Sequence, residues 1–403
     1  MPSRSALHAR AVAAIDQQRH ALAELSARIH ANPEIGYQER QASQWIAAFL
    51  EGAGFEVHRA YRGLETAYRG DASGKGSGPT VAVLSEYDAL PDIGHACGHN
   101  LIAIMGVAGA IGARAVLDSV PGRVAAIGTP AEEGGGGKVA LLRAGGFDDV
   151  DVAMMVHPSS RTLPSRTSLA SNRVDVEFTG RAAHAAAQPD RGLNALEGVL
   201  QTFNSVNAMR QHLRSDARVH GIVTSGGSAA NIIPAYAASK WSVRALDHQY
   251  QQEVLRRFIA CAQGAATATG TTVKVTVNEN AGYENMVPST PLAERWADHL
   301  TGLGVAIQPA VSDERMGSTD MGNISQVIPS IHPYIAIAPD GTPGHSVEFR
   351  DFAGTPEAFD NAIAAAKAMA LVAVDVLADR SLYESARDEF ERRRREGVVR
   401  GRP

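Results

Sequence analysis

The chain has little cysteine and no long apolar run. Only two of its 403 residues are cysteines, Cys97 and Cys261. Two thiols so far apart do not make a disulfide framework, which is typical of a protein kept in a reducing compartment. No window of about eighteen apolar residues predicts a membrane span, and the first thirty residues lack the apolar core of a signal peptide. We therefore expect a cytoplasmic protein without a membrane partner.

The chain also lacks an excess of basic residues. Its 38 Lys and Arg against 43 Asp and Glu give a formal charge of -5. Binding to nucleic acid depends on clustered Lys and Arg, so the composition argues against a nucleic-acid partner. What the chain does have is length and apolar material, with 44% apolar residues. That is more than one compact core usually needs, and it predicts two domains.

Strands and helices alternate in the first part of the chain. Apolar strands are predicted at residues 79–87, 122–130 and 150–158, and a helix at 101–117. This alternation predicts a parallel sheet with crossover helices. Each strand ends in a polar cluster, in the stretches EYDALP, GTPAEEGGGG and HPSS. Ligands of open α/β sheets bind at the carboxyl ends of the strands, so we expect the three clusters to converge.

The middle of the chain has a different pattern. Residues 169–285 follow the order strand, helix, strand, strand, helix, strand, which is the ferredoxin-like unit. We therefore predict an α/β fold in which residues 1–168 and 286–403 form one domain with a mainly parallel central sheet. Residues 169–285 would form an inserted α+β domain.

Cys97 and His99 are the first candidate metal ligands. They stand two apart after a proline and before the predicted helix. We expect both in a loop or extended segment, where their side chains can face one point, because on a helix they would point to nearly opposite faces. Thiolate and imidazole are ligands that zinc and similar divalent ions prefer. For this pair alone, the alternative is a buried thiol beside a hydrogen-bonded histidine.

Glu132 and Glu133 strengthen the metal hypothesis. Two adjacent carboxylates after a strand repel each other unless a cation holds at least one. One can bind a metal while the other stays unbound as a base; the alternative is a solvated acidic turn. His157 lies at the end of a predicted strand and His345 in a glycine-proline loop. Five donors at strand ends or glycine loops of one sheet favour a shared metal site.

These residues belong to a longer series of motifs that resembles a known family. The stretches are EYDALPDIGHACGHN, GTPAEEGGGGK, MVHP, GRAAHAAAQPDRGLNAL, GGSAANIIP, GSTDMGN and GTPGHS. They resemble the metallo-aminoacylase and amidohydrolase peptidases, which include hippurate, indole-acetyl-amino-acid and p-aminobenzoyl-glutamate hydrolases. The resemblance runs in order from about residue 20 to residue 375. It is strongest for the p-aminobenzoyl-glutamate hydrolase and β-alanyl-lysine dipeptidase branch.

The resemblance implies two divalent metal ions per subunit in the larger domain, zinc or manganese first, with cobalt or nickel as alternatives. It also implies that the inserted domain is a lid through which the chain forms a homodimer. Many relatives carry aspartate where Glu86 and Asn100 stand, so neither is assigned as a ligand. By motif matching, the metal ligands are Cys97, His99, Glu133, His157 and His345.

The resemblance also assigns roles around the metals. Glu132 would be the general base, and Asp88 would orient a ligand. His184 would reach the active site of the other subunit and stabilise the oxyanion. Asn231 would contact substrate, and Arg244 would help to hold a carboxylate.

The predicted reaction is hydrolysis of the amide bond in a small N-acyl amino acid or dipeptide with a free carboxylate. Two ions would share and activate one water, and Glu132 would carry its proton to the departing nitrogen. Three alternatives stay open. A cysteine hydrolase could use Cys97 with a histidine, although the paired glutamates would then have no role. The chain could also be a p-aminobenzoyl-glutamate hydrolase subunit that works with a second chain, or a non-catalytic ligand-binding protein braced by metals.

Overall fold

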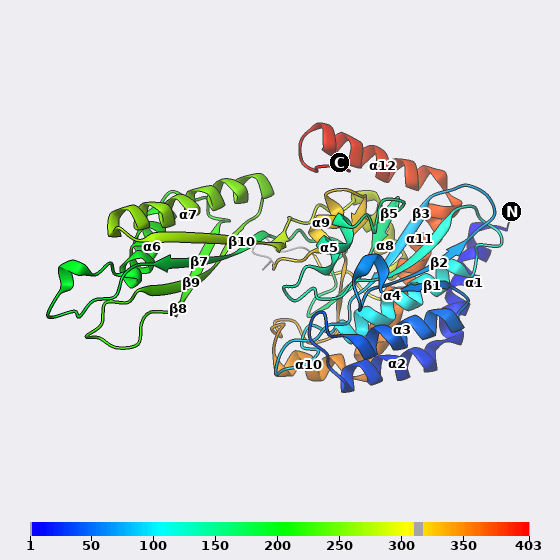
Figure 1. Ribbon diagram of the computed structural model, residues 1–403. Helices are drawn as coiled ribbons and strands as arrows, with labels where there is room; N and C mark the ends of the chain where they lie inside the picture. Colours follow the sequence, from blue (N-terminus) through cyan, green and yellow to red (C-terminus); the bar gives the residue numbers. More distant parts are fainter. Residues whose placement is uncertain (1, 310–316, 403) are drawn as a thin grey trace. The chain divides into compact units, whose positions relative to one another are not determined.

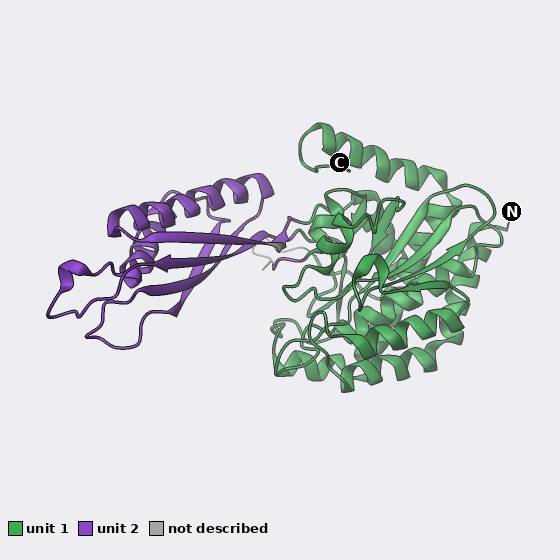
Figure 2. Ribbon diagram, viewed as in Figure 1, with its two compact units in different colours: residues 1–167, 286–316, 320–403 green, residues 168–285, 317–319 purple. Residues whose placement is uncertain are grey.

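The chain forms two compact units (Figures 1 and 2). The computed structural model describes residues 2–309 and 317–402, with only the backbone for 279–281. Among these, residues 2–167, 286–309 and 320–402 make up the first unit. Residues 168–285 and 317–319 make up the second unit. The sequence pattern predicted residues 169–285 for the inserted domain.

A six-stranded mixed sheet forms the centre of the first unit, in the order β1-β2-β4-β3-β5-β11. β3, β4, β5 and β11 are parallel, whereas β1 and β2 add an antiparallel edge. All six residues of β3 are buried, as expected for a parallel strand covered on both faces. This confirms the predicted α/β class with a mainly parallel central sheet. The strands are β1 (Glu56–Arg59), β2 (Tyr68–Ser73), β3 (Thr80–Ser85), β4 (Arg123–Gly128), β5 (Val152–Met154) and β11 (Ser330–Ile331).

Two apolar helices, α4 (His99–Arg114) and α11 (Pro356–Ala378), pack against each other and against β3. α11 is long and apolar enough to span a membrane, but 78% of its most apolar window is buried inside the structure. It is therefore packed as a core helix. The other helices described in this unit are α1 (Arg4–Gln17), α2 (Arg19–Ala31), α3 (Arg40–Gly52), η1 (Tyr61–Gly63), α5 (Gly137–Arg143), α8 (Thr290–Gly302), α9 (Met321–Ser325), α10 (Val347–Ala353) and α12 (Arg380–Arg395).

The second unit is an antiparallel four-stranded sheet in the order β10-β7-β9-β8. Its helices α6 and α7 pack on each other and on the sheet (Figure 1). Buried Val174, Val176 and Phe178 alternate along β7 with more exposed residues, so one face of the sheet carries the core. The elements are β7 (Ala170–Thr179), η2 (Pro189–Arg191), α6 (Ala195–Arg210), β8 (Arg218–Ser225), β9 (Tyr236–Ala245), α7 (His248–Thr269) and β10 (Thr272–Tyr283).

The strand predicted at residues 150–158 is wrong in its extent. β5 ends at Met154, and a separate strand, β6 (His157–Ser159), pairs in parallel with β12 (Tyr334–Ala336) outside the main sheet. His157 therefore begins a short strand and does not end a long one. Pro158 lacks the N–H that a central ladder needs, which favours a break of the strand before it.

Candidate metal centre

Five side chains from separate segments meet in the first unit, beyond the carboxyl ends of its parallel strands. One donor atom each from Cys97, His99 and His157 lies within 4.8 Å of the other two, and the same is true of Cys97, Glu133 and His345. The Sγ atom of Cys97 lies 3.3 Å from Nε2 of His345, which lies 3.4 Å from Oε1 of Glu133. The structure thus brings together all five residues that the sequence suggested as ligands.

A turn at Gly98 allows Cys97 and His99 to face one point. The prediction that both lie in a loop is wrong for His99, which is the first residue of α4. Gly98 has a left-handed backbone with φ +76°, so the chain changes direction between the two donors. A Cβ atom at Gly98 would lie 2.8 Å from Cγ of Pro158, so any side chain there would force Pro158 or the turn to shift.

His345 is held in an unusual backbone conformation beside Cys97. Its φ is +57°, in the left-handed region that non-glycine residues rarely adopt. Its N–H donates to the carbonyl oxygen of Ala96 at 3.0 Å, which ties the two loops together. Such conformations persist where the surrounding structure requires them, and they cluster at functional sites.

Asp88 connects two of the candidate ligands. Nδ1 of His99 lies 3.0 Å from Oδ1 of Asp88 and 2.8 Å from its carbonyl oxygen. Oδ2 of Asp88 accepts a hydrogen bond from the backbone N–H of Glu133 at 3.0 Å. Burial would raise the pKa of Asp88, but the charge and hydrogen bond of His99 outweigh it and lower the pKa. Asp88 therefore fixes the His99 ring and leaves Nε2 as the nitrogen that can bind a metal.

The two adjacent glutamates have opposite electrostatic surroundings. Burial and the charges of Glu86, Glu133 and Asp320 raise the pKa of Glu132 well above its ordinary value. Burial also acts on Glu133, but its contacts with His345 and His99 outweigh it and lower the pKa. Carboxyls whose pKa values are pushed apart in this way suit different roles in acid-base chemistry.

The histidines around Cys97 favour the ionised form of its thiol. Burial and the charge of Glu133 raise its pKa, but hydrogen bonds with the surrounding histidines outweigh both and lower it to about 6. The thiolate is the form that binds metals.

The donors fit a bound divalent cation. Nε2 of His99 and Oε1 of Glu133 are buried and make no hydrogen bond among the described residues, which is costly unless another group satisfies them. A tetrahedral ion with bonds of about 2.1 Å holds neighbouring donors about 3.4 Å apart. The pairs from Cys97 to His345 at 3.3 Å, His345 to Glu133 at 3.4 Å and His99 to Glu133 at 4.0 Å lie around that spacing. Thiolate, imidazole and carboxylate together suit zinc and other first-row divalent ions.

Sequence reasoning missed a buried ion network next to Glu132. The Nζ atom of Lys138 donates to Oε1 of Glu86 and, at 2.6 Å, to Oδ1 of Asp320. All three side chains have no exposed surface. A lysine in a short helix is normally expected at the surface, so there was no reason to single out Lys138. The sequence signal for this network was one charged residue in each of two motifs. Lys138 ends GTPAEEGGGGK, and Asp320 lies inside GSTDMGN.

In the second unit, His184 and Asn231 lie in neighbouring loops. Nδ1 of His184 accepts hydrogen bonds from the backbone N–H groups of Ala186 and Ala187 at 3.3 and 3.2 Å. This assigns the ring proton to Nε2, which makes Nε2 a hydrogen-bond donor. The N–H of Ala185 donates to the carbonyl oxygen of Asn231 at 3.0 Å. The structure therefore brings His184 and Asn231 together.

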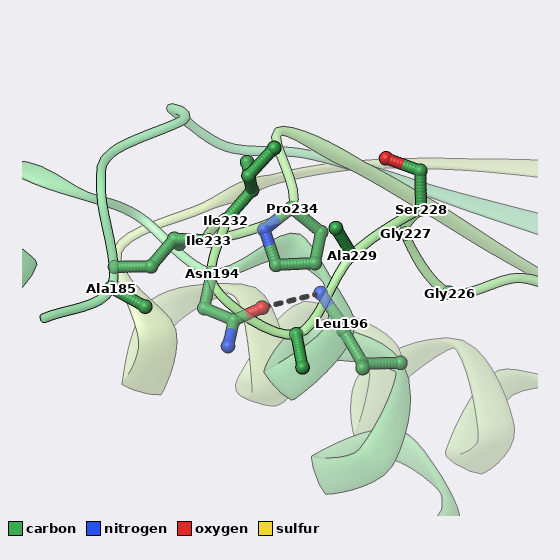
Figure 3. Close-up of a pocket in the computed structure, with 11 residues that line it drawn as sticks. Ala185, Asn194, Leu196, Gly226, Gly227, Ser228, Ala229, Ile232, Ile233 and Pro234 are labelled. Atoms are coloured by element: carbon green, nitrogen blue, oxygen red, sulfur yellow. Dashed lines mark hydrogen bonds between the residues drawn. The ribbon is translucent and has the colours of Figure 1, made fainter.

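A pocket of about 420 Å³ lies beside these loops (Figure 3). Glycines and small or apolar side chains line it, with Asn194 bonded to the N–H of Leu196 at its base. The lining residues are Ala185, Asn194, Leu196, Gly226, Gly227, Ser228, Ala229, Ala230, Ile232, Ile233 and Pro234.

Arg244 is not grouped with His184 and Asn231 within this unit. Asn231 lies in the segment just before β9, which begins at Tyr236. Arg244 lies eight residues further along the strand, roughly 26 Å from Tyr236 at 3.3 Å per residue. Its Nε atom donates to Oγ of Ser242 at 3.0 Å.

Known proteins share both the sequence pattern and the fold. The Peptidase family M20/M25/M40 matches residues 82–371. The chain is 39% identical to a Xaa-Arg dipeptidase of Mus musculus over 399 residues, covering 95% of this chain and 92% of the relative. It is 29% identical to one of the subunits of the p-aminobenzoyl-glutamate hydrolase of Escherichia coli (strain K12), covering 94% and 93%. The crystal structure of a dinuclear metal binding peptidase from Bacillus subtilis matches the fold with a TM-score of 0.69 and 19% identity, covering 90% of this chain and 99% of that one.

Proposed function

The chain belongs to the peptidase family M20/M25/M40, and we propose that it is a metal-dependent hydrolase of dipeptides or small N-acyl amino acids with a free carboxylate. Family membership makes it an amide-bond hydrolase. The observation that carries the metal-dependent mechanism is the convergence of Cys97, Glu133 and His345, and of Cys97, His99 and His157, on common points. Relatives named as dipeptidase and as p-aminobenzoyl-glutamate hydrolase support this substrate class.

The metal ligands would be Cys97, His99, Glu133, His157 and His345. When bound, two divalent ions supply a nucleophile from water at neutral pH and polarise the carbonyl of the scissile amide. Zinc or manganese is our first choice, with cobalt or nickel as alternatives, since the donor set does not select one. Asp88 would hold the His99 ring in the orientation that presents Nε2.

Glu132 would be the general base. It neighbours the ligand Glu133 in sequence, and one of its oxygens lies within 4.8 Å of donor atoms of Glu133 and His99. Its raised pKa suits a carboxylate that takes a proton from the attacking water and holds it. The same carboxyl would then deliver the proton to the departing nitrogen.

The second unit would serve as lid and dimerisation domain. His184, with Nε2 as donor, would stabilise the oxyanion in the other subunit's active site, and Asn231 beside it would contact substrate. Arg244 is kept as a proposed carboxylate contact. β8 supports a homodimer because it is an edge strand that exposes Ile222 and Val223 at 63% and 45%.

A second candidate is a subunit that works with a different chain. The Escherichia coli p-aminobenzoyl-glutamate hydrolase has two different subunits, and this chain is 29% identical to each. The exposed edge strand β8 makes the homodimer our first choice. A cytoplasmic location is proposed because both cysteines are free thiols, which is typical of a reducing compartment.

Chelation followed by a substrate screen tests the proposed function. The purified protein is treated with EDTA and then assayed with each metal against Xaa-Arg dipeptides, β-alanyl dipeptides, N-acyl amino acids and p-aminobenzoyl-glutamate. We expect hydrolysis of at least one class, its loss on chelation and its return with metal. Activity that survives complete metal removal would contradict the proposal and would favour a cysteine nucleophile.

A further inference from the structure

Glu86 presents a buried oxygen to the metal centre. It follows β3 directly, and its side chain has no exposed surface. Its Oε2 atom makes no hydrogen bond among the described residues and lies 3.5 Å from Nε2 of His99. Nε2 of His99 is itself buried without a hydrogen bond, since Asp88 occupies the other ring nitrogen. Two buried polar atoms therefore face each other at ion-pair distance, with no hydrogen bond to either among the described residues.

The spacing of these atoms is that of two ligands on one ion. At 3.5 Å the pair is longer than an ordinary N–H···O hydrogen bond of about 2.7–3.2 Å. It is close to the roughly 3.4 Å that separates neighbouring donors on a tetrahedral ion. It also lies within the 3.3–4.0 Å range found among the proposed ligands.

Lys138 fixes the direction of this carboxylate. Lys138 holds Oε1 of Glu86 through its ammonium group. Both oxygens of Asp320 bind the same lysine, Oδ1 at Nζ and Oδ2 at the backbone N–H at 2.9 Å. The lysine charge also offsets the two carboxylates, which a buried site requires. Glu86 is thus oriented with Oε2 toward His99.

We propose that Glu86 is a sixth metal ligand, binding through Oε2 the ion that His99 holds, and that Lys138 is its positioning residue. This inference rests on the proposed metal site. It gives a shared cation to Oε2 of Glu86 and Nε2 of His99, two buried atoms that lack a hydrogen bond among the described residues.

Metal titration of three proteins tests the inference. Wild type, Glu86→Gln and Asp320→Asn are stripped of metal and titrated with Zn²⁺ in a metal-buffered solution, and bound metal is measured by mass spectrometry. The Co²⁺-loaded proteins are then compared by absorption spectroscopy, which reports the ligands around the ion. Asp320→Asn is the matched control because it also removes one negative charge next to Lys138, while both of its oxygens already bind that lysine.

We expect Glu86→Gln to weaken the binding of one ion by at least about tenfold and to change the Co²⁺ spectrum. Asp320→Asn should keep both ions and the wild-type spectrum. Unchanged metal binding in Glu86→Gln, or an equal loss in Asp320→Asn, would overturn the inference while leaving the proposed function intact. A wild type that binds no metal would overturn the proposed function itself. If Glu86→Gln does not fold, Glu86→Asp replaces it, with the same expected weakening and the same contrary result.

Discussion

Glu132 and Glu133 are sequence neighbours for which we propose opposite roles. A carboxylate oxygen of Glu133 lies within 4.8 Å of donor atoms of Cys97 and His345. A carboxylate oxygen of Glu132 lies within the same distance of oxygens of Glu86 and Asp320. A substitution that keeps the shape of each side chain therefore separates metal binding from proton transfer.

Glu132→Gln is expected to keep its metal and to lose turnover by about 10²- to 10⁴-fold, the range of general acid-base catalysis. The amide resembles the protonated carboxyl that burial favours at this position, so the fold should be retained. Glu133→Gln is the matched variant and should lose metal. Metal content and kcat of the two proteins are measured side by side. Near wild-type turnover in Glu132→Gln would remove the assigned base.

At the residue scale, sequence alone suggested the donors because five potential ligands fall at predicted strand ends or glycine loops of one sheet. It could not indicate Lys138, since its importance comes from burial between Glu86 and Asp320, which are far from each other in sequence. It also could not establish the orientation of His99, which depends on the hydrogen bond to Asp88.

At the scale of elements, α4 approaches β3 at Gly106. A Cβ atom there would lie 2.1 Å from Oγ of Ser85 and 2.5 Å from the carbonyl oxygen of Leu84. We expect Gly106→Ala to lower the free energy of unfolding of the first unit by about 1–3 kcal/mol, because the helix that begins at His99 must move off the sheet. Urea unfolding measures the change.

Gly52→Ala is the control for this prediction. Gly52 ends α3 in the same unit, and a Cβ atom there would meet nothing within 4 Å. Its free energy of unfolding should stay within about 0.5 kcal/mol of wild type. Equal stability of the two variants would mean that the α4–β3 contact does not require a glycine.

A second contact between elements centres on Asp375. The buried carboxylate joins α11 to α1 and α8. Its four partners lie at 2.7–2.8 Å and are Arg4, His8, Arg295 and His299. Burial would raise the pKa of Asp375, but the hydrogen bonds of His299, His8 and Arg295 outweigh it and hold the pKa well below its ordinary value.

Asp375→Asn is expected to lower the free energy of unfolding by about 3–5 kcal/mol at neutral pH, because it leaves buried partners without their carboxylate. A carboxyl with a depressed pKa stabilises the folded state above its unfolded pKa of about 4, and this stabilisation is lost as the pH falls below that value. The gap in stability between wild type and variant should therefore be constant near neutral pH and begin to narrow below about pH 4, without closing by pH 3. Urea unfolding from pH 7 down to pH 3 measures both curves.

Asp118→Asn provides the comparison, since Asp118 pairs with Arg10 while its own side chain is 65% exposed. Solvent screening leaves such a pair little effect, so no measurable loss is expected. A gap between wild type and Asp375→Asn that stays constant with pH would contradict the depressed pKa.

Element order was predictable because hydrophobic periodicity is a local property. The βαββαβ order of the second unit follows directly from the alternation between period 2 and period 3.6 along residues 170–283. The break between β5 and β6 was not predictable from periodicity, because residues 150–156 are almost continuously apolar. The break becomes visible in the strand pairing, because β6 pairs with β12 in a separate sheet while β5 belongs to the main sheet.

At the scale of the whole molecule, the proposed homodimer depends on the exposed edge of β8. Ile222→Asp is expected to convert the dimer to monomer, because a charge on this edge disfavours strand pairing between copies. Analytical ultracentrifugation measures the assembly. Val398→Asp, at a residue that is 49% exposed in the first unit, is the control and should leave the dimer intact. A monomeric wild type would contradict the proposed assembly.

The element pattern of the sequence changes near residues 169 and 285, and the second unit contains residues 168–285. The return of residues 317–319 to the second unit could not be predicted from the sequence, because it depends on contacts such as the hydrogen bond from the N–H of Leu169 to the carbonyl of Gly317 at 2.8 Å. Sequence patterns report local order along the chain, whereas such contacts join residues about 150 positions apart.

Anomalous X-ray diffraction from crystals of the Zn²⁺-loaded protein, measured across the zinc absorption edge, tests the central claim most directly. We predict two anomalous peaks per chain within bonding distance of Cys97, His99, Glu133, His157 and His345, with Glu132 bound to neither. The absence of peaks among these side chains, or a peak coordinated by Glu132, would contradict the account.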